Sequence, residues 1–227
     1  MQSGIFCADI GTSSLKAAFI TEDGTVLKFI RLLYPQPVQA VDWVQAFFAA
    51  WHILPADYTV EAICVSGNGP SLVAVPQNRR VSQASINTAA PLSAASLPPD
   101  DVMNGIIDAA KNDTLFLWNE PVSQGLTVSG QQGATVPAPQ DGAASIPPTG
   151  LSLFLPRIAA FRAKYPDVFA GAAQLFSGPE YVSYLLTGAA VTSLPDPRYE
   201  AAYWSKEELF RFSEALHIDT ERLAGLL

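Results

Sequence analysis

The chain has 227 residues, of which 49% are hydrophobic and 15% are charged, so one large domain or two small ones can bury a core. Its net charge of −8 and the lack of a basic run exclude a polyanion-binding surface, and we expect no nucleic-acid partner. No apolar run is long enough to span a bilayer, and the first residues lack the basic segment of a secretory signal. Because no stretch is predicted to span a membrane, we expect no membrane partner. Because no secretory signal is predicted, we expect a cytoplasmic protein.

The first part of the chain predicts a mixed β-sheet. Three strand-like stretches are separated by short turns, and the second turn contains Asp23-Gly24, a strong hairpin signal. Apolar residues then recur at helical spacing over residues 41–52, before another buried strand at 61–69. A helix that crosses between two strands makes those strands parallel, so the sheet combines parallel and antiparallel pairs. The three strand-like stretches are residues 4–10, 15–21 and 26–33.

The middle of the chain is less regular. Short strands are expected at 72–75 and near Val81, and an amphipathic helix at 101–111. A strand-like stretch follows at 114–118. Residues 121–150 are rich in glycine, proline, glutamine, alanine and serine, which is typical of irregular loop.

The last third of the chain is predicted to be helical. Two short helices follow residue 151, with Pro166 at the break between them. Two further helices, 177–188 and 205–218, each begin with the Ser-x-x-Glu spacing of a capping box. The capping pairs are Ser177 with Glu180 and Ser205 with Glu208, and Gly188 ends the first of these helices.

The turn after the first strand carries residues suited to phosphate and metal. Asp9 stands at the end of that strand, and Gly11, Thr12 and Ser13 form the turn. The backbone N–H groups of such a turn can converge on an anion, and glycine permits close approach of an oxygen and a positive φ. Lys16 returns on the second strand as a nearby cation. Because Asp9 has the opposite charge, it would serve a hydrated Mg²⁺ rather than the phosphate.

Simpler explanations exist for these side chains. Asp and Gly are common in ordinary turns and lysines are common on surfaces, so the pattern alone is also compatible with a turn that has only a structural role.

The two cysteines, Cys7 and Cys64, lie in apolar, strand-like stretches. We expect both to be buried, reduced core residues.

Four stretches in order resemble the FGGY carbohydrate kinases of the actin/Hsp70/sugar-kinase superfamily. Residues 9–16, DIGTSSLK, are similar to the family's first phosphate motif. VDWVQAFFAAW at 41–51 resembles its acidic-Trp helix, and ICVSGNG at 63–69 resembles its sugar-side loop. Residues 153–204 resemble a later helical stretch of the family. The resemblance implies an α/β, actin-like ATPase (ribonuclease H-like) lobe with a mixed five-stranded sheet flanked by helices.

The resemblance also implies ligands and site residues. ATP, Mg²⁺ and a sugar or polyol are the expected ligands, with Asp9 on the metal and Lys16 on the γ-phosphate. Gly11, Thr12 and Ser13 would face the phosphates of ATP. Positioning and charge stabilisation carry most of phosphoryl-transfer catalysis, so these residue types suit the reaction.

Several positions depart from the family pattern, so the sugar is not identified. Asn68, followed by Gly69 and Pro70, stands where the family places longer polar residues that bind sugar hydroxyls. Asn87 lies where the family has a Trp-x-Asp-x-Arg segment, and LWNE at 117–120 is a displaced partial match to it. Asn68 and Asn87 are nevertheless the substrate-binding candidates.

The resemblance covers only the first lobe of such a kinase. We expect residues 1–227 to form the N-terminal, sugar-side lobe, with a poorly matched excursion at about 84–150. The family's general-base Asp lies in the C-terminal lobe, so no catalytic residue is expected in this chain, which alone would transfer no phosphate. The alternative is a half-kinase that acts as a non-catalytic sugar-binding regulator or interaction module and needs a partner or a dimer. A non-catalytic actin-like assembly domain is a third, weaker interpretation.

Overall fold

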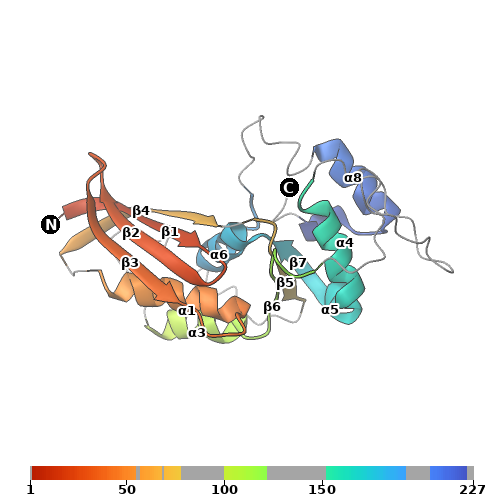
Figure 1. Ribbon diagram of the computed structural model, residues 1–227, viewed down its shortest axis with the longest axis horizontal. Helices are drawn as coiled ribbons and strands as arrows, with labels where there is room; N and C mark the ends of the chain where they lie inside the picture. The colour runs from red at the N-terminus through yellow and green to blue at the C-terminus, as the bar shows by residue number, and fades with distance from the viewer. Residues whose placement is uncertain are drawn as a thin grey trace.

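The computed structural model describes residues 2–54, 57–67, 69–77, 100–121, 152–192 and 205–223. Its strands form two separate sheets, each with its own helices, and they lie side by side along the long axis of the molecule (Figure 1). The first sheet is mixed and has the order β3-β2-β1-β4. The second sheet is antiparallel and has the order β6-β5-β7.

The mixed sheet is built as the sequence predicts. β1 (Gln2–Ile10), β2 (Ser14–Thr21) and β3 (Val26–Leu33) form an antiparallel meander. Helix α1 (Ala40–His52) then crosses over to β4 (Tyr58–Gly67), which pairs parallel with β1. The expectation of a mixed sheet with helices is confirmed, although the described residues place four strands in this sheet rather than five.

The strand expected at residues 72–75 does not extend the mixed sheet but belongs to the second sheet. β5 (Leu72–Pro76) pairs with β6 (Thr114–Phe116) and β7 (Ala172–Phe176). The expected strand near Val81 lies outside the described residues. β7 was not predicted, because its sequence AAQLF has no clear alternation of apolar and polar residues.

The alternation of β5 side chains explains why this strand lies between two hydrophobic cores. Val73 and Val75 belong to the core under the mixed sheet, whereas Leu72 and Ala74 belong to the second core. Successive strand residues point to opposite faces, so a strand that is apolar at every position must be covered on both faces. An edge position in the mixed sheet would not supply that cover.

The helices divide between the two cores. α1, α3 (Asp100–Ala110) and α6 (Gly178–Thr187) contribute to the core of the mixed sheet. α4 (Leu155–Lys164), α5 (Pro166–Gly171), α8 (Lys206–Ala215) and the 3-10 helix η2 (Thr220–Leu223) surround the second core. In the described residues, no helix is long and apolar enough to cross a membrane.

One face of the mixed sheet is left open in the part of the chain that the structure describes. Side chains on the other face, such as Phe6, Leu15 and Phe19, are fully buried against α1 and α6. The open face instead presents Phe29, which is 63% exposed, and Leu33, which is 72% exposed. The expected helices therefore cover one face of this sheet in the described residues.

The three predicted caps have different outcomes. Ser205 and Glu208 form the expected capping box at the start of α8, and Gly188 ends α6 in the left-handed region with φ 72°. The capping box predicted at Ser177 is wrong, because its side chain accepts no bond from the helix. The Glu180 carboxylate accepts a hydrogen bond from the Thr192 hydroxyl at 3.2 Å instead.

Candidate functional site

The bend between β1 and β2 is closed by its own backbone. The Gly11 N–H donates to the carbonyl oxygen of Ser14 at 3.1 Å. A Cβ on Gly11 would lie 2.7 Å from that same oxygen, closer than side chains approach, so only glycine fits. The φ of Gly11 is not positive, so the reason for glycine is close approach and not a left-handed conformation. The Gly11 amide is therefore used within the bend itself, and Thr12 and Ser13 are the other two residues of the turn predicted to face a phosphate.

Asp9 and Lys16 face each other across the mouth of this bend. They are directly opposite in the antiparallel pair of β1 and β2, and Lys16 Nζ lies 3.0 Å from Asp9 Oδ2. Both side chains are about half exposed, at 44% for Asp9 and 46% for Lys16. An exposed pair of this kind contributes less than about 1 kcal/mol, so a stronger ligand can separate the two charges. The structure therefore brings together the predicted metal and phosphate residues.

An open pocket of about 260 Å³ adjoins this ion pair on the uncovered face of the sheet. Asp9 and Lys16 form its polar side, together with Ser66 at the end of β4. Asp9 is directly paired with Ser66 in the parallel register of β1 and β4. The remaining lining residues are Cys7, Ala8, Ala17, Ala18, Phe29 and Cys64.

The expectation of buried cysteines is wrong. Cys7 is half-buried and Cys64 is exposed, since both point toward the open face rather than toward the core. The two strands that carry them are apolar on both faces in sequence, so the sequence could not show which face is covered.

A tryptophan from the second half of the chain contacts the bend. The Trp118 Nε1–H donates to the Thr12 hydroxyl at 2.8 Å, and the Trp118 backbone N–H donates to Ser71 Oγ at 3.0 Å. Its side chain remains 46% exposed. Trp118 follows β6, so the pairing of β6 with β5 delivers it to the bend. In the sequence, the only indication of a role for Trp118 was the partial motif LWNE at residues 117–120. This motif lies within the poorly matched residues 84–150, away from the position that it has in the family.

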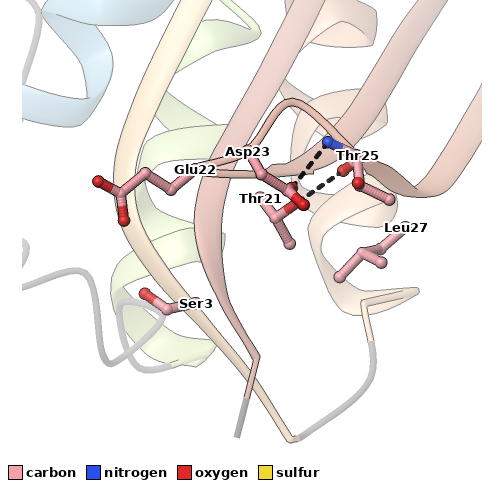
Figure 2. Close-up of a pocket in the computed structure, with 6 residues that line it drawn as sticks. All are labelled: Ser3, Thr21, Glu22, Asp23, Thr25 and Leu27. Atoms are coloured by element: carbon pink, nitrogen blue, oxygen red, sulfur yellow. Dashed lines mark hydrogen bonds between the residues drawn. The ribbon is translucent and has the colours of Figure 1, made fainter.

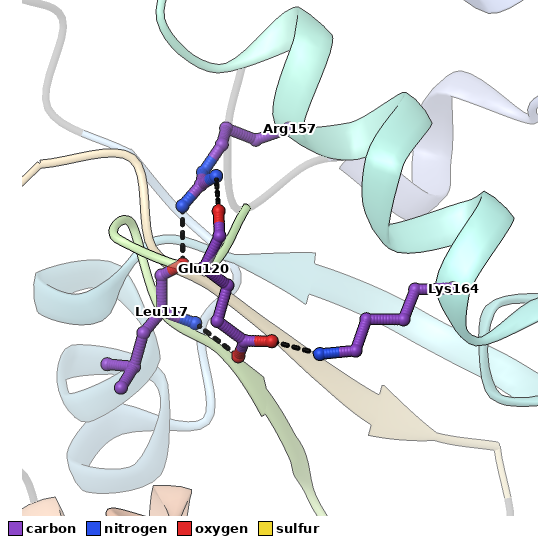
Figure 3. Close-up of polar contacts among 4 residues, drawn as sticks. All are labelled: Leu117, Glu120, Arg157 and Lys164. Carbon is purple, nitrogen blue, oxygen red and sulfur yellow. Dashed lines mark hydrogen bonds and ion pairs between the residues drawn. The ribbon is translucent and has the colours of Figure 1, made fainter. Parts of the chain in front are cut away.

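A buried arginine fixes the segment that carries Trp118 (Figure 3). Arg157, from α4, donates to the backbone carbonyl oxygens of Leu117 and Glu120, the latter at 2.6 Å. The Glu120 carboxylate accepts from the Leu117 N–H at 3.1 Å and pairs with Lys164. Burial lowers the pKa of Arg157, and the nearby Glu120 charge opposes this. The hydrogen bond from Lys164 to Glu120 raises the pKa of Lys164.

A buried hydroxyl also lies near the bend. Tyr34 follows β3, and its N–H donates to the Ser13 carbonyl oxygen at 3.0 Å. Its side chain is buried, and its hydroxyl has no partner among the described residues. Burial raises the pKa of Tyr34, and the negative charges of Asp9 and Asp42 raise it further. The phenol therefore stays protonated and keeps a hydrogen-bond donor beside the bend.

The residues at the bend fit a hydrated magnesium ion better than a fully protein-bound one. The described residues contain no group of three or more His, Cys, Asp or Glu side chains able to hold a metal. Mg²⁺ commonly keeps several waters and takes one or two carboxylates together with substrate phosphates. Asp9 supplies one half-exposed carboxylate, which meets that requirement.

A second pocket, of about 550 Å³, lies at the other end of β2 and is not suited to phosphate (Figure 2). It surrounds the predicted Asp23-Gly24 hairpin, whose Gly24 has φ 86°. Asp23 accepts hydrogen bonds from the Thr21 hydroxyl and from the Thr25 N–H, and these bonds lower its pKa. The acidic side chains there would repel an anion, and their bonds serve the turn.

The two predicted sugar-binding residues, Asn68 and Asn87, lie outside the described residues. Gly69, next to Asn68, is described, and its φ of 53° lies in the left-handed region. An added Cβ there would contact the Trp118 side chain at 3.6 Å. The loop after β4 and the segment after β6 therefore meet beside the bend.

The fold defined by this sheet, its crossover helix and the bend is that of the carbohydrate kinases with an actin-like ATPase fold. The chain superimposes on the gluconate kinase from Lactobacillus acidophilus with a TM-score of 0.53 and 16% identity, over 98% of this chain and 41% of that one. For the xylulose kinase from Rhodospirillum rubrum the TM-score is 0.54 and the identity 14%, over 97% of this chain and 42% of that one.

These comparisons confirm the expected resemblance to carbohydrate kinases at the level of the fold. The chain spans about two fifths of the length of the solved kinases that it matches. No protein-family model matches the chain, and no curated protein matches its sequence.

Proposed function

We propose that this chain is the phosphate-binding and sugar-side lobe of an ATP-dependent carbohydrate kinase. The observation that carries the proposal is the open Asp9–Lys16 pair at the mouth of the glycine bend, in a chain with the fold of gluconate and xylulose kinases. Such kinases transfer the γ-phosphate of ATP to a sugar hydroxyl, and the acceptor here is a sugar or polyol.

Each residue at the bend has a role that its chemistry supports. Lys16 would bind the terminal phosphate as a point charge, and the Thr12 and Ser13 amides would position it. Asp9 would hold Mg²⁺, partly through water, and the ion when bound would neutralise charge on the phosphates. Gly11 keeps the bend tight enough for these groups to converge.

Trp118 is the described residue best placed for the sugar. Its half-exposed indole lies beside the bend and offers a flat apolar face with a polar edge already bonded to Thr12. Asn68 and Asn87 remain candidates for the sugar hydroxyls. The general base belongs to a second lobe, so we propose that the 227-residue chain alone binds its ligands weakly and transfers no phosphate.

Binding of Mg·ATP to the purified chain, measured by titration calorimetry, tests this proposal. Lys16→Met is expected to weaken binding about tenfold or more, because a hydrogen bond to a charged group contributes about 1.5–3 kcal/mol. Asp9→Asn should reduce the dependence of binding on Mg²⁺. The matched control is Asp108 with Lys111, an exposed ion pair at 2.6 Å at the end of α3.

The control changes Asp108→Asn and Lys111→Met should leave binding unchanged. Equal affinity of the Lys16→Met and wild-type chains for Mg·ATP would refute the assignment of the bend. Rapid sugar phosphorylation by the isolated chain would instead refute the need for a second lobe.

A second candidate is the half-kinase that acts as a non-catalytic sugar-binding regulator or interaction module. The observation that favours it is the open face of the mixed sheet, where Phe29 and Leu33 are mostly exposed in the part of the chain described. Exposed apolar patches of this kind mark interaction surfaces.

A further inference from the structure

Two cysteines lie directly opposite each other on the open face of the mixed sheet. Cys7 of β1 and Cys64 of β4 are paired residues in the parallel register of these strands. Both line the same pocket, so their side chains point to the same side of the sheet. Cys64 is exposed and Cys7 is half-buried, and neither is in a disulfide.

The spacing of neighbouring strands suits a bond between these two residues. Adjacent strands lie about 4.8 Å apart, and disulfides span Cα–Cα distances of about 4.4–6.8 Å. The sheet order places β4 at the edge, with β1 as its partner within this sheet. An edge strand can adjust its distance from its neighbour slightly when the two sulfur atoms join, because it need not keep a second pairing.

We propose that Cys7 and Cys64 form a reactive dithiol that a hydroperoxide converts to an intramolecular disulfide. This site does not depend on the proposed kinase function, although it shares a pocket with Asp9 and Lys16.

The exposure of the two thiols assigns their roles. Cys64, in its thiolate form, attacks one oxygen of the hydroperoxide; the S–O bond forms, the O–O bond breaks and Cys64 becomes a sulfenic acid. The other oxygen leaves as hydroxide or alkoxide and takes up the proton that the thiol released, which gives water or an alcohol. Cys7 is half-buried and directly opposite Cys64, so it is the less accessible thiol and is placed to react with the oxidised Cys64.

The second step consumes the sulfenic acid. Cys7 loses its proton and attacks the Cys64 sulfur; the S–S bond forms and the S–O bond breaks with release of water. With hydrogen peroxide, two thiols and one peroxide give one disulfide and two waters, so two electrons pass from sulfur to oxygen. A thiol reductant reverses the change by thiol–disulfide exchange.

The oxidised pair is expected to alter the phosphate site next to it. Cys7 lies two residues from Asp9 on β1, and Cys64 lies two residues from Ser66 on β4, all in one pocket. A disulfide between β1 and β4 therefore fixes the spacing of these strands beside Asp9 and Ser66, on the side of the pocket that these two residues share.

The test treats the reduced, native 227-residue chain with hydrogen peroxide and follows it by intact mass and non-reducing peptide mapping. The expected product is a monomer that has lost two hydrogen atoms, with Cys7 and Cys64 peptides joined, and dithiothreitol restores it. Cys7→Ser should stop at the sulfenic acid of Cys64 or form linked dimers. Cys64→Ser should leave Cys7 oxidised roughly tenfold more slowly than Cys64 in the Cys7→Ser chain, because Cys7 is half-buried whereas Cys64 is exposed to the oxidant.

Circular dichroism shows that each variant is folded before oxidation. Two free thiols after treatment, separate over-oxidation of each cysteine, or linked dimers of the wild-type chain would each overturn the proposal. Mg·ADP binding is then compared between the reduced and oxidised forms. A disulfide that forms in a chain with no nucleotide binding in either state would contradict only the proposed function.

Discussion

At the scale of single residues, Gly11 decides the shape of the bend. A methyl group at this position would meet the Ser14 carbonyl oxygen at 2.7 Å, and a backbone atom cannot move aside cheaply. We expect Gly11→Ala to lower the free energy of unfolding by about 1–3 kcal/mol, as overpacking does. Urea denaturation followed by circular dichroism measures this change.

Gly105 is the matched control for this substitution. It lies in the exposed middle of α3, where an added Cβ has nothing within 4 Å. Gly105→Ala should therefore stabilise the chain by about 0.5–1 kcal/mol, since alanine loses less backbone entropy in a helix. A Gly11→Ala chain as stable as the wild type would show that the bend can relax.

The same scale shows what the sequence could and could not predict about the site. The contact of Asp9 with Lys16 was predictable because a short turn makes nearby residues face each other across an antiparallel pair. The contact of Trp118 with Thr12 joins residues separated by 106 positions, and no local pattern specifies it. The roles of these residues toward ATP, Mg²⁺ and a sugar remain predictions.

At the scale of elements, local sequence patterns predicted correctly those structures that form between residues close together in the sequence. The Asp23-Gly24 hairpin and the Ser205–Glu208 capping box need only neighbouring residues, and both form. The similar Ser177 signal failed because Glu180 bonds Thr192, which lies beyond the end of α6. The pairing of β5 with β6 and β7 depends on which core covers each face of β5, which sequence spacing alone does not state.

The segment from Leu117 to Glu120 depends on one side chain of α4. Arg157 donates to the carbonyl oxygens of Leu117 and Glu120, and also to that of Pro70 at 3.4 Å. Arg157→Met removes the guanidinium donor from all three carbonyls, although Leu117 keeps the bond from the Glu120 N–H, so we expect the free energy of unfolding to fall by about 3 kcal/mol. Hydrogen exchange should also accelerate at the amides of Leu117 and Trp118.

Arg211 provides the control at this scale. It pairs with Glu207 on the exposed surface of α8, with both side chains mostly in solvent. Arg211→Met should cost less than about 0.5 kcal/mol and leave exchange at Trp118 unchanged. Equal effects of the two substitutions would mean that Arg157 does not position this segment.

At the scale of the whole molecule, the two sheets are unequally covered in the described residues. Val73 and Phe176 of the second sheet pack into one core, and Leu72 and Leu175 pack into the other, so that sheet is covered on both faces. The mixed sheet is covered on one face only, and its open face carries Phe29 at 63% exposure. A surface of this kind is expected to bind another protein surface, either a second lobe or a second copy.

The chain alone is therefore expected to self-associate as its concentration rises, which sedimentation velocity measures. Phe29→Lys should weaken this association at least tenfold, because it places a charge at the centre of the apolar surface. Phe210, 60% exposed on α8, is the control, and Phe210→Lys should leave association unchanged because α8 belongs to the second core and not to the mixed sheet. A chain that stays monomeric at every concentration would argue against the half-kinase and leave the kinase lobe as the better account, since a lobe can meet its partner within one longer polypeptide.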